Sequence, residues 1–293
     1  MRTFVPWQAK LASKVIAANL PIPYSFWRRH GIAKLGAMLN PEYARDVYKH
    51  HVTHANASAK TLLEIGPGDS LFTAVYAYPR FKKTVLIDAG RFAETEPRPY
   101  SVLIDELRNM GECMPEETEY SSLETLLNAL SCEYLIDGVD SFFDLQDGEI
   151  DFSFSHSCLQ HIPLNQFQTL ADELYRVTAA GGTGSHLLDF RDMLAGSLNH
   201  LRFPSSAWET GWVRKTNMYT NRLRIGNIQR AFQKSGFDVE IYERKRWDRL
   251  PISRASLNTE FRSMDDEELL VYGGHLLLRK GATKRKTQDC AQP

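Results

Sequence analysis

A polar pair interrupts an apolar run in the second half of the chain. In SHLLDF, residues 185–190, His186 and Asp189 stand among apolar neighbours. A histidine can take a proton from a reacting hydroxyl, and a carboxylate can orient its ring. We therefore predict that His186 is a catalytic base and that Asp189 is its orienting partner or a ligand of the hydroxyl. The alternative interpretation is that His186 is a hydrogen-bonded buried histidine and that Asp189 caps the next helix.

A second candidate site lies in TLLEIGPGDSLF, residues 61–72, where an apolar strand runs into a glycine-containing turn. Gly66 and Gly68 allow a tight turn and a close approach of the backbone to a ligand. Leu71 stands where a dinucleotide-binding loop requires glycine, and no GK[ST] follows, which disfavours nicotinamide binding and excludes a Walker loop. Asp88 ends the next apolar run, where a carboxylate can accept hydrogen bonds from ribose hydroxyls. The two features together predict a ligand that contains a nucleoside.

Alternating strands and helices must position these residues. Repeated strand–helix units predict a doubly wound, mostly parallel, Rossmann-like α/β sheet of seven strands. In such a sheet, ligands bind beyond the carboxyl ends of the strands. The expected strands lie within residues 61–65, 83–90, 132–138, 149–157, 183–190, 237–247 and 271–280.

The segments outside the sheet differ from it in pattern. Residues 7–20 carry apolar side chains at helical spacing, and residues 26–55 are rich in aromatic and basic residues. We expect an N-terminal helical cap over residues 1–58, the sheet domain over 59–280, and a disordered tail over 281–293.

Composition limits the class of protein. The chain has 293 residues, 43% hydrophobic residues and a net charge of -1, which suits one large domain and argues against a general nucleic-acid binder. Its four cysteines form no CxxC pair, so neither a zinc ribbon nor a disulfide framework is indicated. No signal peptide or membrane-spanning run is visible. We expect a cytoplasmic protein that acts on a small molecule, without nucleic-acid or integral membrane contact.

The glycine turn resembles the first motif of class I S-adenosylmethionine-dependent methyltransferases, which reads acid-x-Gly-x-Gly-x-Gly. Glu64 supplies the acid, whereas Ser70 replaces the third glycine and Pro67 removes one backbone donor. The resemblance covers about residues 61–190 and includes DGVDSFFDLQDGEIDFSFSHSCLQHI, residues 137–162.

The resemblance implies S-adenosylmethionine as the cofactor and methyl transfer to an oxygen or nitrogen of a small polar acceptor. Glu64, Gly66 and Gly68 are implied to surround the methionine part of the cofactor, and Asp88 to bind its ribose. Asp137, Gly138 and Val139 are implied to border the adenine, and Ser155 and His156 to lie beneath the sulfonium. The alternatives are a nicotinamide-dependent oxidoreductase, or a non-catalytic nucleoside-binding domain in which the glycines only turn the chain.

Beyond residue 185 the chain also resembles a methyltransferase branch associated with bacterial polysaccharide and surface-sugar clusters. The resemblance lies in residues 185–203 and 208–224, with PYSFWRRHG and NPEYARDVYKHH near the N-terminus. It implies a sugar-like or other polar acceptor. Three arginines, Arg191, Arg222 and Arg224, are predicted to bind a carboxylate or phosphate of the substrate, and structural ion pairs are the alternative.

Two further histidine patterns allow more than one interpretation. His50, His51 and His54 have helical spacing, which would suit two metal ligands. No carboxylate or cysteine nearby in the sequence completes such a site, so we predict a hydrated or substrate-flanking helix face and no metal. His161 is either a structural residue or a participant in the reaction.

Overall fold

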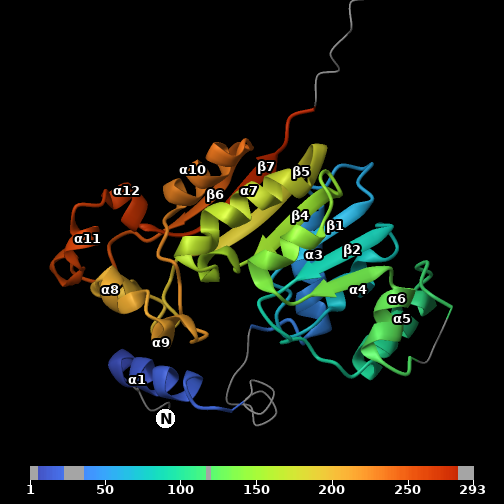
Figure 1. The fold of residues 1–293 in the computed structure, drawn as a ribbon, viewed down its shortest axis with the longest axis horizontal. Coiled ribbons are helices and arrows are strands. Elements are labelled where there is room, and N and C mark those ends of the chain that lie inside the picture. Colours follow the sequence, from blue (N-terminus) through green and yellow to red (C-terminus); the bar gives the residue numbers. More distant parts are fainter. Residues whose placement is uncertain (1–5, 23–35, 117–119, 283–293) are drawn as a thin grey trace, which may run out of the picture.

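One seven-stranded sheet organises the protein, as seen in a computed structural model that describes residues 6–22, 36–116 and 120–282 (Figure 1). The strand order is β3-β2-β1-β4-β5-β7-β6. The strands are β1 Thr61–Ile65, β2 Lys83–Ile87, β3 Cys132–Leu135, β4 Ile150–His156, β5 Thr178–Asp189, β6 Asp238–Arg246 and β7 Val271–Arg279. Strands β1 to β5 pair in parallel, and β7 is antiparallel to β5 and β6. The predicted doubly wound, mostly parallel sheet is confirmed.

Helices cover both faces of the sheet. The first layer comprises α3 Pro41–Val52, α4 Phe72–Ala77, α5 Arg98–Asn109 and α6 Leu123–Ala129, and the second comprises α7 Phe167–Val177 and α10 Ile225–Ser235. Successive strand residues point to opposite faces. Leu62 and Phe154 accordingly pack in the first layer, and Leu63 and Ile65 pack in the second.

The two helices of the predicted N-terminal cap have different positions. Helix α3 packs directly on the sheet, with Val47 in the same core as Phe154. Helix α1, Trp7–Ala18, lies instead beside α9, Gly211–Arg214, where Lys14 donates a hydrogen bond to Asn217 (Figure 1). Helix α3 is thus part of the sheet's own helical layer. The domain boundary after residue 58 stays a prediction.

Some predictions lie outside the described residues. The PYSFWRRHG segment does, and so does all of the C-terminal tail except its first two residues. Within the described part of the chain, no helix is both long and apolar enough to cross a membrane.

A small second core stands at one end of the sheet. It is built from the segments after β5 and β6, which carry α8 Ser205–Trp208, α9, α11 Thr259–Arg262 and α12 Asp266–Leu269 (Figure 1). Leu198, Leu201 and Phe261 are among its buried residues. Both β5 and β6 are antiparallel to β7, so they end at the same edge as β1, β2 and β4. The second core therefore borders the edge where the candidate site lies.

Candidate functional site

The glycine loop after β1 has the backbone conformation that only glycine adopts easily. Gly66 has φ +80° and Gly68 has φ +71°. A Cβ atom added to Gly66 would overlap Sγ of Cys158, in the turn after β4. Glycine at position 66 is therefore required both by the backbone angle and by the close approach of this turn.

Asp88 links the end of β2 to the glycine loop. Its Oδ2 accepts a hydrogen bond of 3.0 Å from the Gly68 backbone N, and its Oδ1 accepts one of 2.8 Å from the Ala89 N. Burial raises the pKa of Asp88 to about 6, although these two hydrogen bonds act in the opposite direction. The carboxylate thus lies at the loop, where the sequence predicted a ribose-binding residue.

The turn after β3 adjoins Asp88. The Gly138 backbone N donates a 2.9 Å hydrogen bond to the Asp88 carbonyl oxygen. Asp137 donates from its backbone N to Oγ of Ser141, which holds the start of the turn. Val139 is only 4% exposed and packs in the second layer. The backbone of this turn can therefore border an adenine, whereas the side chain of Val139 belongs to the core.

Glu64 is a buried acid at the base of the loop. It is 1% exposed, and its Oε2 has no hydrogen-bond partner among the described residues. Burial raises the pKa of Glu64 to about 8. A buried polar atom without a partner is costly, so an incoming ligand that supplies one would find a ready site.

Ser70, in the position of the motif's third glycine, turns its side chain away from the loop. Its hydroxyl donates a 2.5 Å hydrogen bond to the carbonyl of Met38, just before α3. The departure from the methyltransferase motif therefore ties the loop to the N-terminal segment.

The predicted catalytic pair is not a pair in the structure. His186 is fully buried, its Nδ1 lies 2.9 Å from Oγ of Ser155, and its ring stacks on Phe232 of α10. Asp189 instead binds Arg191, with 2.6 Å between Oδ2 and the guanidinium nitrogen. Residues three apart on a strand point to opposite faces, so Asp189 cannot orient His186. The pairing was wrong, and the Ser155 side chain, predicted to line the cofactor floor, faces the core.

Two of the three predicted substrate arginines are structural. Arg222 is 6% exposed and donates to the Phe203 carbonyl and the Ser205 hydroxyl. Arg224 is 1% exposed and donates to backbone carbonyls near α12, with its guanidinium over the Phe190 ring. Both guanidinium groups are buried and bonded mainly within the protein, although Nε of Arg222 and Nη1 of Arg224 have no partner among the described residues, which corrects the prediction that they bind the substrate. Only Arg191 remains at the rim of the site.

His161, in the turn after β4, has one ring nitrogen fixed by the protein. Its Nδ1 lies 2.6 Å from the carbonyl oxygen of Tyr219. A carbonyl only accepts, so Nδ1 carries the proton and Nε2 keeps a lone pair. Burial lowers the pKa of His161, while the Tyr219 carbonyl and the charge of Asp189 act in the opposite direction. Asp189 thus acts electrostatically on His161 rather than on His186.

Among the described residues, five histidines gather where α3 packs on β4 and β7: His50, His51, His54, His156 and His275. We call this group the histidine cluster.

Hydrogen bonds join three members of the cluster: Ser185 of β5 links His51 to His275, and His51 contacts His156 directly. His51 lies 2.7 Å from Oγ of Ser185 through Nδ1 and 3.1 Å from Nδ1 of His156 through Nε2. Ser185 Oγ also lies 2.8 Å from Nε2 of His275. Burial and the neighbouring histidines lower the pKa of His156 and of His275 to about 4. His156, predicted to lie beneath the sulfonium, is therefore tied to a buried network at the end of β4.

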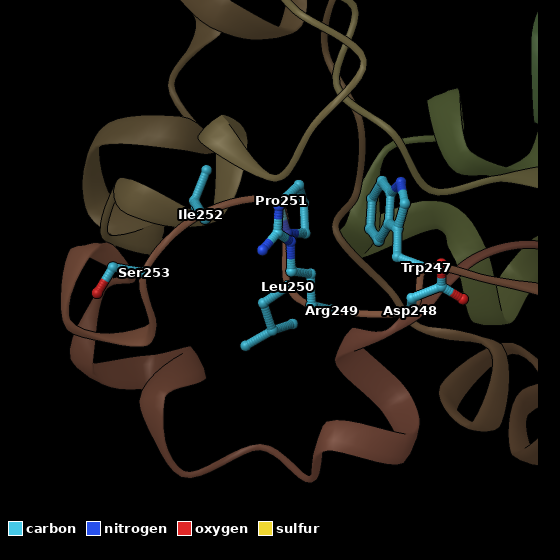
Figure 2. A pocket seen from close by; sticks show the side chains of 7 residues that line it. All are labelled: Trp247, Asp248, Arg249, Leu250, Pro251, Ile252 and Ser253. Atoms are coloured by element: carbon cyan, nitrogen blue, oxygen red, sulfur yellow. The ribbon is translucent and has the colours of Figure 1, made fainter.

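A hollow elsewhere on the surface is not built like this site. It is lined by the single segment Trp247–Ser253, which follows β6 (Figure 2). The glycine loop, Asp88 and the turn after β3 converge from several strands, and that convergence identifies the candidate active site at the carboxyl edge.

Comparison with known proteins gives similarity at the level of fold. No family model and no curated protein matches the chain. Among solved structures, it is similar to an S-adenosylmethionine-dependent methyltransferase from Archaeoglobus fulgidus, with 9% identity, 82% of this chain and 95% of that chain covered, and a TM-score of 0.46. A Methanosarcina mazei methyltransferase of the same description gives 15% identity, 78% and 96% coverage, and a TM-score of 0.47.

A third similar structure is an O-methyltransferase family protein from Burkholderia thailandensis. It shares 12% identity over 95% of this chain and 64% of that chain, with a TM-score of 0.48. Because these scores lie below one half, the site of this chain itself must carry the functional argument.

Proposed function

We propose that this protein binds S-adenosylmethionine and transfers its methyl group to an oxygen or nitrogen of a small polar acceptor. The observation that carries the proposal is the contact of Gly68 with the Asp88 carboxylate and of Gly138 with the Asp88 backbone carbonyl, which brings three strand ends together around one aspartate. The unpartnered Glu64 oxygen beside the loop fits a ligand that completes the site.

Different residues of the site bind different parts of the cofactor. Asp88 accepts hydrogen bonds from the ribose hydroxyls, the backbone of residues 137–139 borders the adenine, and the glycine loop surrounds the methionine part. When bound, the cofactor supplies an activated methyl group. Holding the acceptor in line with that group is worth ~7–11 kcal/mol in well-oriented reactions.

His161 removes the proton if the acceptor is a hydroxyl. Its Nε2 has the lone pair, since Nδ1 is held by the Tyr219 carbonyl. Asp189 stabilises the charge that the ring gains, and its ion pair with Arg191 fixes it at the end of β5. A base positioned in this way contributes about 10²–10⁴-fold to the rate.

A sugar is the acceptor class that the resemblance beyond residue 185 implies, and it remains part of the proposal. Arg222 and Arg224 are buried and bonded within the protein, so Arg191 is the arginine of the predicted set that can meet a polar acceptor. An acidic sugar would gain an ionic contact there.

The nicotinamide alternative has less support. Leu71 is 1% exposed and packs in the first helical layer at the start of α4, where a dinucleotide loop requires glycine.

The test has two stages. Calorimetry should detect binding of S-adenosylhomocysteine and none of NAD, and the reverse result would overturn the proposal. Labelled S-adenosylmethionine is then offered with neutral sugars, acidic sugars, amines and phenols. Transfer to any of them supports the enzyme, and preference for the acidic sugars supports the Arg191 contact.

A further inference from the structure

The histidine cluster brings together ligand atoms from the two ends of the chain. His50 and His51 lie on α3, and His275 lies on β7. One ring nitrogen from each of the three lies within 4.8 Å of the other two. Neither the glycine loop nor the proposed base uses these three residues.

His275 shows the arrangement typical of a metal-binding histidine. Its side chain is fully buried, and its Nδ1 has no hydrogen-bond partner among the described residues. Its other nitrogen, Nε2, lies 2.8 Å from Oγ of Ser185. Metal-bound histidines commonly use one ring nitrogen for the ion and bond the other to a polar group that fixes the ring. A buried nitrogen without a partner therefore points to a missing ligand.

We propose that His50, His51 and His275 form a binding site for a zinc-class divalent cation. Three imidazoles without a carboxylate favour zinc, copper, nickel or cobalt over magnesium or calcium, which prefer oxygen ligands. Three protein ligands leave a coordination position open for water or for another ligand.

The geometry requires two adjustments. Both ring nitrogens of His51 already have partners, so its Nε2 must exchange the 3.1 Å contact with Nδ1 of His156 for the ion, while its Nδ1 keeps the contact with Ser185 Oγ. Zinc–nitrogen bonds are about 2.0–2.1 Å, so the three nitrogens must approach to about 3.4 Å from one another in a tetrahedral site. His50 is exposed on α3 and can rotate inward. The His50 and His275 rings are already 5.0 Å apart between centroids.

Apolar, aromatic and charged side chains surround the proposed metal site. Phe154 stacks under His51 at 4.8 Å and supplies an apolar wall. His54, just after α3, and Tyr242 of β6 face His275, with ring centroids 5.1 and 5.3 Å from it. The charge of Lys245 also acts on His275 and opposes a cation, while the ion pair of that lysine with Glu243 reduces this repulsion.

The site revises one sequence-based argument. The prediction of no metal depended on the absence of a completing ligand close to His50, His51 and His54. His275 supplies that ligand from more than two hundred residues away in the sequence, because β7 lies next to β5 in the sheet.

The test uses the full chain without a histidine tag, after dialysis against a chelator. Titration with Co²⁺ is followed by visible absorption, and Zn²⁺ is then added to displace it. We expect one equivalent of Co²⁺ in a low-coordinate site. His50→Asn, which changes an exposed residue, should abolish this phase, and Lys49→Gln on the same helix should leave it unchanged. Ser185→Ala should weaken binding about 10–100-fold through loss of the ring-fixing contact.

Thermal melting without metal establishes that each variant is folded. Absence of the cobalt absorption in the parent protein would overturn the proposal. Equal binding by the parent, His50→Asn and Lys49→Gln would also overturn it, since the result would then be an adventitious ion only. In either case the cluster is a hydrogen-bonded network of histidines without a bound ion.

Discussion

The carboxylate of Asp88 lies 3.0 Å from the backbone nitrogen of Gly68, so the residue predicted to bind ribose also fixes the loop that surrounds the rest of the ligand. One carboxylate oxygen of Asp88 accepts a hydrogen bond from the loop at Gly68, and the other accepts one from the backbone nitrogen of Ala89. Each carboxylate oxygen can accept a second hydrogen bond, which leaves capacity for the two hydroxyls of a ribose.

Asp88→Asn tests this double role. The amide removes the charge and one acceptor, so S-adenosylhomocysteine binding should weaken by about 1.5–3 kcal/mol, the cost of losing hydrogen bonds to a charged group. Calorimetry measures this as a loss of about tenfold to more than a hundredfold. Asp140→Asn, an exposed acid in the next turn, is the matched control. Unchanged affinity in Asp88→Asn would rule out the ribose role.

Glu64→Gln tests the buried acid. Because the pKa of Glu64 rises from 4.5 to about 8 on burial, the folded state retains a proton that the unfolded state releases between these values. Stability should therefore fall as pH rises from 4.5 to 8, by up to about 1.4 kcal/mol per pH unit. Urea unfolding across this range should show a flatter profile for Glu64→Gln. Glu149→Gln, which removes a partner of Lys83, should keep the decline, and an equal slope in parent and Glu64→Gln would contradict the assignment.

Gly66→Ala tests the close packing of the loop on the turn after β4. The new methyl group would meet both Sγ and Cβ of Cys158 at distances that real contacts do not reach, and the backbone angle adds about 1–2 kcal/mol. We expect a lower melting temperature and weaker S-adenosylhomocysteine binding. Adding Cys158→Gly removes the clash but not the backbone cost, so the double variant should recover only part of the loss. No recovery would show that the contact is not the cause.

His161→Gln and His186→Gln separate the two candidate bases. With a hydroxyl acceptor identified, single-turnover transfer should fall about 10²–10⁴-fold in His161→Gln. His186→Gln changes a ring that contacts Ser155 and Phe232 in the core, so it should alter stability more than rate. Cofactor affinity is measured in parallel. A normal rate in His161→Gln, with loss in His186→Gln, would restore the original assignment.

The sequence predicted each strand because apolar runs ending in glycine or polar residues are local signals. It also placed Asp88 and the turn at Asp137 at one edge, since parallel strands share their carboxyl ends. The predicted pairing of His186 with Asp189 conflicts with their spacing, because two residues three apart on a strand point to opposite faces.

Other features could not be predicted from local pattern. The carbonyls that bind Arg222 and Arg224 come from segments well removed in sequence, so nothing near these arginines distinguishes them from substrate ligands. The meeting of His51 with His275 likewise depends on strand order, because β7 enters between β5 and β6. Only the assembled sheet reveals which distant side chains become neighbours.

The position of β7 also has a consequence for biosynthesis. Within the described part of the chain, strand β6 pairs only with β7, and β5 has β7 as its outer neighbour. A nascent chain that has not reached residue 271 therefore has an unpaired β6 and an open edge on β5, which is a template for association with other chains. The sheet is completed only when the last strand leaves the ribosome, so premature termination before this strand would yield an aggregation-prone fragment rather than a smaller working protein.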